Sequence, residues 1–66
     1  FLVIPKKHIG SVAYLTPEDK DLMGEMILTA QKVAQEKKLN SYRLRINTGK
    51  GAGQIIDHLH MHIFSW

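Results

Sequence analysis

The sequence predicts an α+β domain in which an antiparallel sheet packs against one long amphipathic helix. Residues 16–38 carry apolar side chains at helical spacing, and residues 42–48 and 58–64 alternate apolar and polar side chains as strands do. The glycine-rich stretch between those two strands is short enough to join them as an antiparallel pair. With 66 residues in all, we expect residues 1–66 to form a single domain with a small core.

The first strand and the helix are predicted from local signals. Residues 1–5 form an apolar run ended by proline, which is consistent with a strand buried on both faces. Thr16 can cap a helix, and Pro17 suits its first position. One helix face is apolar, with Leu22, Met23, Met26, Ile27, Ala30, Val33 and Ala34. We expect the helix to end near Lys38, where Asn40 can close it.

The second strand and the glycine-rich stretch follow. Tyr42, Leu44 and Ile46 share one face of residues 42–48, and Arg43, Arg45 and Asn47 share the other. Residues 49–53, Gly-Lys-Gly-Ala-Gly, fit neither common glycine-rich nucleotide motif, and a strand rather than a helix follows them. The stretch is either a plain hairpin connection or a loop that faces a phosphate.

Composition narrows the classes of function. There is no cysteine, which excludes disulfides and thiolate metal sites. A net charge of +3 favours phosphate-bearing ligands, but the basic residues are scattered, so we expect no nucleic-acid binding. No apolar run is long enough to span a membrane. So short a chain usually needs a partner subunit, and its start at Phe1 suggests a processed chain or a fragment.

The histidine cluster near the end of the chain carries the chemistry. His58, His60 and His62 alternate with apolar residues, so a strand places the three imidazoles on one face. A neutral imidazole is a nucleophile at pH 7, and its neighbours can stabilise negative charge on the group transferred. Crowding the rings penalises double protonation, which keeps one of them neutral.

Two other interpretations of the cluster stay open. The histidines can be ordinary residues of a half-exposed strand. Alternatively, two of them can bind zinc with His8 or Asp57 as a third ligand, although three same-face residues on one straight strand converge poorly on one ion.

Residues 58–63, His-Leu-His-Met-His-Ile, preceded by Gly53 and Gln54, resemble the signature of the histidine triad (HIT) family. Residues 1–9 resemble the strand that opens the family core, and residues 42–49 resemble the strand before its glycine turn. The resemblance covers the whole chain and is closest to the Hint-type nucleoside phosphoramidases. The chain would then be the C-terminal core portion of the family fold.

The resemblance implies a cytoplasmic hydrolase or transferase that acts at the α-phosphorus of purine nucleotides. His60 would form a covalent nucleotidyl intermediate, with His58 and His62 orienting its ring and holding phosphoryl oxygens. The phosphate pocket would be lined by Asn47, Gly53 and Gln54. No metal or other cofactor is implied, and the partner would be a second copy of the chain in a homodimer.

Two departures from the family pattern bear on activity. Ile55 stands where the Hint-type pattern has a serine that donates a proton, and the N-terminal helix and hairpin that complete the nucleoside pocket have no counterpart. We therefore expect weak or indiscriminate nucleotide binding. A catalytically weak nucleotide-binding or dimerisation module and a dinucleoside polyphosphate hydrolase are the alternative functions.

Overall fold

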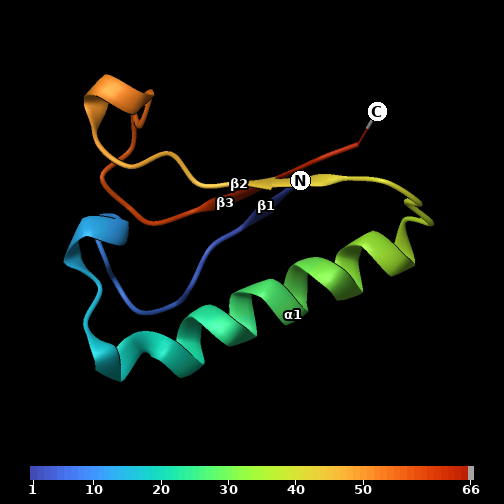
Figure 1. Ribbon diagram of the computed structural model, residues 1–66, viewed down its shortest axis with the longest axis horizontal. Coiled ribbons are helices and arrows are strands. Elements are labelled where there is room, and N and C mark those ends of the chain that lie inside the picture. The colour runs from blue at the N-terminus through green and yellow to red at the C-terminus, as the bar shows by residue number, and fades with distance from the viewer. Residues whose placement is uncertain (66) are drawn as a thin grey trace.

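Two layers, a small sheet and one long helix, make up the chain (Figure 1). The structure is a computed structural model, and it describes residues 1–65. The sheet is formed by β1 (Leu2–Val3), β2 (Arg43–Arg45) and β3 (Met61–Phe64), and the helix α1 (Lys20–Glu36) covers one of its faces. The predicted α+β class, with one helix against an antiparallel sheet, is confirmed.

The strand that carries the end of the histidine motif lies in the middle of the sheet. The strand order is β1-β3-β2, and β3 runs antiparallel to both neighbours. His62 is paired with Leu2 on one side and with Arg45 on the other. Directly paired residues point to the same face of a sheet, so these three side chains share the face opposite α1.

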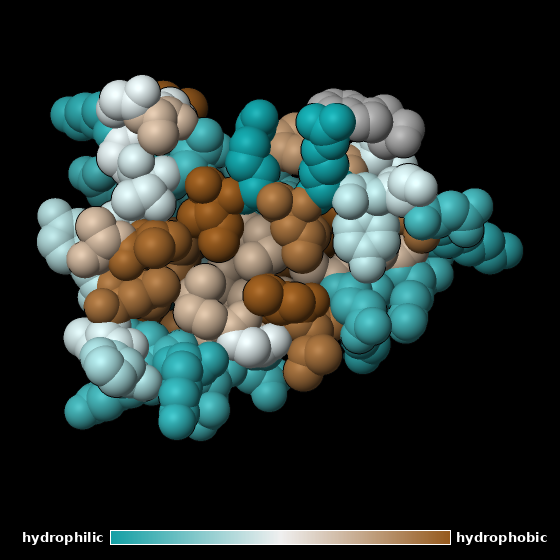
Figure 2. Space-filling model, in the orientation of Figure 1, coloured by the Kyte–Doolittle hydropathy of each residue, from teal (hydrophilic) through white to brown (hydrophobic). Residues whose placement is uncertain are grey.

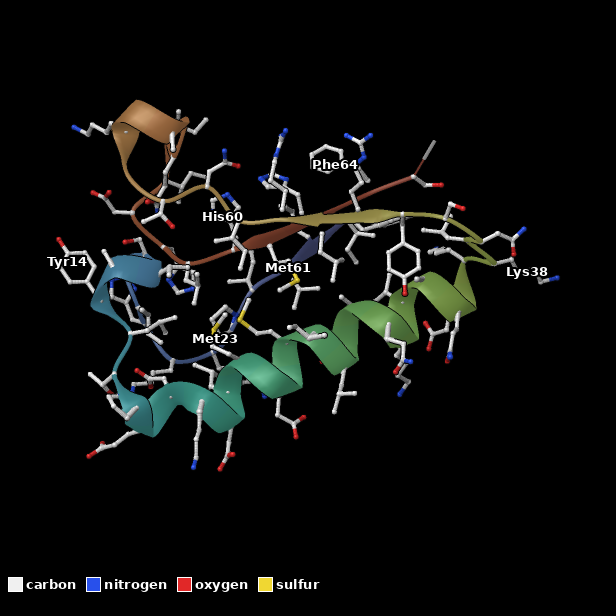
Figure 3. The ribbon with its side chains drawn as sticks, viewed as in Figure 1. Tyr14, Met23, Lys38, His60, Met61 and Phe64 are labelled. Atoms are coloured by element: carbon white, nitrogen blue, oxygen red, sulfur yellow. The ribbon has the colours of Figure 1, made fainter. Side chains whose placement is uncertain are left out.

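The core lies between the sheet and α1. Figure 3 shows Met23 and Met61 in this layer, whereas Phe64 lies on the other side of the sheet. Ala30 and Ala34 are fully buried, and their small side chains let the helix approach the strands closely. The buried cluster consists of Val3, Ile9, Met26, Ala30, Leu59, Met61 and Ile63.

The first strand differs from its prediction. We expected residues 1–5 to be buried on both faces, but β1 has only two residues, and Leu2 and Ile4 are more than half exposed. The reason is that β1 lies at the edge of the sheet, where one face packs on α1 through Val3 and no second layer within residues 1–65 covers the other. An apolar run cannot by itself distinguish this arrangement from a doubly covered strand.

The other two strands are shorter than predicted. β2 is three residues long rather than residues 42–48, and β3 begins at Met61, after His58 and His60. The chain before β3 is bonded differently: the N–H of Leu59 donates to the Ile9 carbonyl at 2.6 Å, and that of His58 to the Ile56 carbonyl at 2.8 Å. The predicted alternation nevertheless continues through this segment, because Leu59, Met61 and Ile63 are all buried.

The helix ends are set by specific hydrogen bonds. A 3₁₀ turn, η2 (Pro17–Asp19), precedes α1, and the Asp19 carboxylate accepts hydrogen bonds from the backbone N–H and hydroxyl of Thr16 at 3.0 and 3.3 Å. At the other end Lys38, rather than Asn40 as we expected, takes the left-handed conformation, with φ of 58°. The N–H of Leu39 then donates to the Ala34 carbonyl, which closes the helix in a Schellman arrangement.

Within residues 1–65, no helix is long and apolar enough to cross a membrane.

The buried Asp19 carboxylate predicts how stability depends on pH. The Lys7 ammonium, 2.6 Å away, holds the pKa of Asp19 below its usual range, assisted by the Thr16 N–H. A carboxyl whose pKa is lowered by folding stabilises the fold above its unfolded pKa, and that contribution disappears as the pH falls through the folded pKa. We expect Asp19→Asn to lower the midpoint of thermal unfolding at pH 7, with a smaller difference from wild type at about pH 2.

Circular dichroism melts across this range test the prediction, with Asp21→Asn as the control because Asp21 is exposed on α1. If Asp19→Asn and wild type differed equally at pH 7 and pH 2, the carboxylate charge would have no part in stability.

Candidate functional site

A cavity of about 420 Å³ lies on the sheet face opposite α1. The three imidazoles of His58, His60 and His62 all line it, as their alternation with buried residues predicted. The glycine-rich loop closes one side. The complete lining is Leu2, Ile4, Arg45, Asn47, Gly53, Ile55, Ile56, His58, His60 and His62.

His60 is the most buried of the three histidines, with 9% of its surface exposed (Figure 3). Its Nδ1 lies 2.8 Å from the backbone carbonyl oxygen of His58. A carbonyl oxygen only accepts hydrogen bonds, so Nδ1 carries the proton, and in the neutral ring Nε2 keeps its lone pair. The backbone thus fixes both the orientation of the ring and the nitrogen that can act as a nucleophile.

His58 is held by contacts of its own. Its Nε2 lies 3.2 Å from the Pro5 carbonyl oxygen, so Nε2 is the donor there. Its Nδ1 lies 3.1 Å from Nδ1 of His8, and in a neutral His58 ring this atom accepts the proton of His8. We expected the side chain of His58 to orient His60; here its backbone carbonyl does so, and both of its ring nitrogens are occupied by protein groups.

His62 lies between rings. Its ring centroid is 4.9 Å from that of His60, edge to face, and 5.5 Å from that of Phe64, nearly parallel. Burial lowers the pKa of His62, and the charges of His60, Arg45 and the N-terminus lower it further. This imidazole is therefore neutral over a wider range of pH than that of a free histidine. Within residues 1–65, it forms no ion pair with a carboxylate.

Asn47 and Gly53 lie in the cavity wall, where we expected phosphate-binding residues. The Asn47 amide nitrogen donates to the Ala52 carbonyl at 2.6 Å, which leaves its second hydrogen and its oxygen for a ligand. Gly53 has φ of 90°, and its N–H donates to the Lys50 carbonyl. Gly53 therefore offers space rather than a free backbone donor in this arrangement.

Gln54, the third residue expected to bind substrate, lies elsewhere. Its side chain is 6% exposed and lines a second cavity on the far side of the loop. Its amide oxygen accepts from the Gly49 N–H at 2.8 Å, and its amide nitrogen donates to the carbonyls of Gly10 and Ile56 at 2.7 and 2.9 Å. Gln54 thus connects the glycine loop to the connector after β1 and shapes the triad cavity indirectly.

Sequence reasoning missed one polar residue of the triad cavity and one contact beside it. Arg45 lines the triad cavity, although we treated it only as part of the polar face of its strand. Its spacing from Asn47, two residues along one strand, was a usable signal. His8, which we considered only as a possible zinc ligand, contacts His58, a residue 50 positions away.

The histidines do not form a metal centre among themselves. In the part of the chain that the structure describes, no three His, Asp or Glu side chains are grouped closely enough to hold an ion. The set considered for zinc, two triad histidines with His8 or Asp57, does not form such a group within residues 1–65: His8 contacts His58, and both His8 and Asp57 line the second cavity.

The buried amide of Gln54 predicts a measurable role in the loop. Gln54→Ala removes three hydrogen bonds and leaves the Gly49 N–H without its acceptor, so we expect a loss of about 1–3 kcal/mol in the free energy of unfolding. Urea unfolding measures the loss, and amide hydrogen exchange should show faster exchange at Gly49. Gln35→Ala on the exposed face of α1 is the control, and an equal effect of both changes would refute the bracing role.

The sequence is similar to those of known proteins. The family described as "Scavenger mRNA decapping enzyme C-term binding" matches residues 1–66. The chain is 44% identical to Protein HitA of Neisseria gonorrhoeae over 63 residues, which is 94% of this chain and 59% of that protein. It is 42% identical to an uncharacterised HIT-like protein of Synechocystis over 71 residues, 98% of this chain and 62% of that one. The chain thus spans about three-fifths of the length of these relatives.

Solved structures resemble the fold closely. A HIT family hydrolase from Legionella pneumophila superposes with a TM-score of 0.94 at 36% identity, covering 97% of this chain and 59% of that one. A HIT family hydrolase from Clostridium thermocellum gives 0.93 at 34% identity, with 98% and 58% covered. Sequence match, fold and the position of the three histidines lead to the same result: the chain belongs to the histidine triad family.

Proposed function

We propose that this chain is the catalytic core of a nucleotide hydrolase that acts at the α-phosphorus of purine nucleotides through a covalent intermediate on His60. The observation that carries the proposal is the hydrogen bond from His60 Nδ1 to the His58 carbonyl, because it leaves the Nε2 lone pair available. The names of the Legionella and Clostridium thermocellum relatives, both HIT family hydrolases, support the reaction class.

The reaction would proceed in two displacements. In the first, Nε2 of His60 forms a bond to the α-phosphorus, and the bond from phosphorus to the leaving group breaks with its electron pair on that group. In the second, water attacks the same phosphorus, loses a proton, and the bond to Nε2 breaks to return the imidazole. Dividing one difficult displacement into two easier ones is the usual advantage of a covalent nucleophile.

The neighbours of His60 would stabilise the charge that develops on the phosphoryl oxygens. His62 and the free hydrogen of Asn47 lie in the same cavity and can donate to those oxygens. His58 has no free nitrogen, so its part is to hold His60 through its carbonyl. We assign substrate contact to His60, His62 and Asn47, and positioning to His58, Gly53 and Gln54.

The nucleoside would lie over the apolar side of the cavity. Leu2, Ile4, Ile55 and Ile56 line that side, and each is more than half exposed. An apolar wall can pack against a purine ring, but it offers no hydrogen bonds to the polar atoms that distinguish one base from another. This arrangement supports weak discrimination among bases by the chain as it stands.

A second copy of the chain is the partner we propose. Exposed apolar side chains lie on α1, where they include Ile27 and Leu28, and on the helix-facing side of β2, where Leu44 is paired with the buried Ile63. Figure 2 shows apolar side chains gathered over the middle of one face of the molecule. A homodimer that covers such residues would add to the small core of a 66-residue chain.

The nucleophile predicts the first experiment, hydrolysis of adenosine 5′-phosphoramidate in the presence of a chelator. We expect His60→Ala to lower kcat by about 10³-fold or more, because without the nucleophile the other residues of the site cannot form the covalent intermediate. His60→Asn keeps an amide N–H that can donate to the His58 carbonyl, but it has no imidazole nitrogen to attack phosphorus. We therefore expect the same loss. Tyr14→Phe, at an exposed position outside the cavity, is the control.

Turnover by His60→Asn at the wild-type rate would exclude the covalent mechanism. Absence of turnover from the folded wild-type chain would instead favour a nucleotide-binding or dimerisation module.

One observation favours the second function, a catalytically weak nucleotide-binding or dimerisation module. Ile55 is 90% exposed at the cavity wall and has no proton to give to an amine leaving group. We expect Ile55→Ser to raise kcat for the phosphoramidate by about 10-fold or more, a modest share of what a general acid contributes. Ile55→Ala, which removes the apolar bulk without adding a donor, is the matched control. Equal rates for the two variants would show that proton donation at position 55 is not limiting.

A further inference from the structure

Arg45 is the charged side chain of the triad cavity. Of the cavity-lining residues in the part of the chain that the structure describes, it alone carries a fixed charge, and none is a carboxylate. The ion pair found within residues 1–65 joins Lys7 and Asp19, away from this cavity. Within residues 1–65, no carboxylate therefore neutralises the positive charge that Arg45 brings to the cavity.

The sheet register fixes where this charge lies. Arg45 is the direct partner of His62 across β2 and β3, so both side chains rise from the same face with their Cβ atoms about 5 Å apart. An anion in contact with the His62 imidazole is consequently within reach of the long arginine side chain. Together with burial and the charge of His60, the positive charge of Arg45 also lowers the pKa of His62.

Aromatic packing holds the guanidinium at one end of the cavity. Its central carbon lies 4.4 Å from the ring centroid of Phe64, and Phe64 is stacked on His62. Stacking on a ring leaves the in-plane N–H groups of a guanidinium free to donate. The Arg45 side chain therefore contacts an aromatic ring and can still donate hydrogen bonds to an anion.

The cavity is polarised across the sheet. Leu2 and Ile4 line it on the β1 side, where the wall is apolar, and Arg45 and Asn47 line it on the β2 side. The histidines lie between the two, in and before β3. A nucleotide whose α-phosphoryl group faces His60 and whose nucleoside lies over β1 directs its next substituent toward Arg45.

We propose that Arg45 binds a second anionic group of the substrate, the one next to the phosphoryl group that faces His60, and that the cavity therefore prefers nucleotides with consecutive phosphates over monophosphates. The proposal rests on the function proposed above only for the placement of the first phosphoryl group. Its test measures binding and needs no turnover.

The experiment compares the dissociation constants of ADP and AMP by calorimetry, in a His60→Asn background so that the nucleophile cannot consume either ligand. We expect ADP to bind about five-fold more tightly than AMP, the effect of one charge pair at an exposed site. Arg45→Gln should bring this ratio to about one with little change for AMP, and Arg45→Lys should keep part of it. Raising the salt to about 0.5 M should reduce the ratio, because exposed charges are screened.

Arg43→Gln is the matched control, since Arg43 lies on the same strand and face but outside the cavity lining. The proposal is overturned if the ADP:AMP ratio survives in Arg45→Gln, if Arg43→Gln loses it equally, or if the parent shows no preference. Each variant is first checked for an unchanged thermal midpoint. A hydrolysis assay that fails while the ratio behaves as expected would reject the proposed reaction and leave the role of Arg45 standing.

Discussion

The alternation of residues 58–63 is the constraint on which the rest of this structure depends. Leu59, Met61 and Ile63 are buried against α1, and the intervening histidines are thereby directed to the opposite face. A shift of one residue would place imidazoles in the core and leucine in the cavity, so the register is fixed by hydrophobic burial. In so small a domain the same few residues therefore carry stability and position the chemistry.

Regular strand geometry alone does not build the site. His58 and His60 precede β3, in a segment whose backbone bonds to Ile9 and Ile56 rather than to a neighbouring strand. This departure from the ladder frees the His58 carbonyl, which a regular strand would use for pairing, to accept from the His60 ring. The orientation of the proposed nucleophile is thus a consequence of where the strand begins, and the buried Gln54 amide stabilises the loop before it.

The predictions from sequence succeeded where a pattern is periodic and failed where tertiary contacts decide. The helix, the pairing of the last two strands and the inward face of residues 59–63 were predicted, because each follows from the spacing of apolar residues. The exposed face of β1 was not predicted, since an apolar run cannot reveal that no second layer within residues 1–65 covers it. The buried role of Gln54 and the contact of His8 with His58 depend on groups 44 and 50 residues away.

The charges of the cavity act together with its histidines. Burial and the positive charge of Arg45 both lower the pKa of His62, so the free site favours a neutral imidazole there. The negative charge of an anion that binds beside Arg45 and His62 opposes this effect, which raises the affinity of that imidazole for a proton. The cavity, which has no carboxylate among its lining residues within residues 1–65, can therefore keep the His62 ring neutral before an anionic ligand arrives and make it a better proton donor once the ligand is bound.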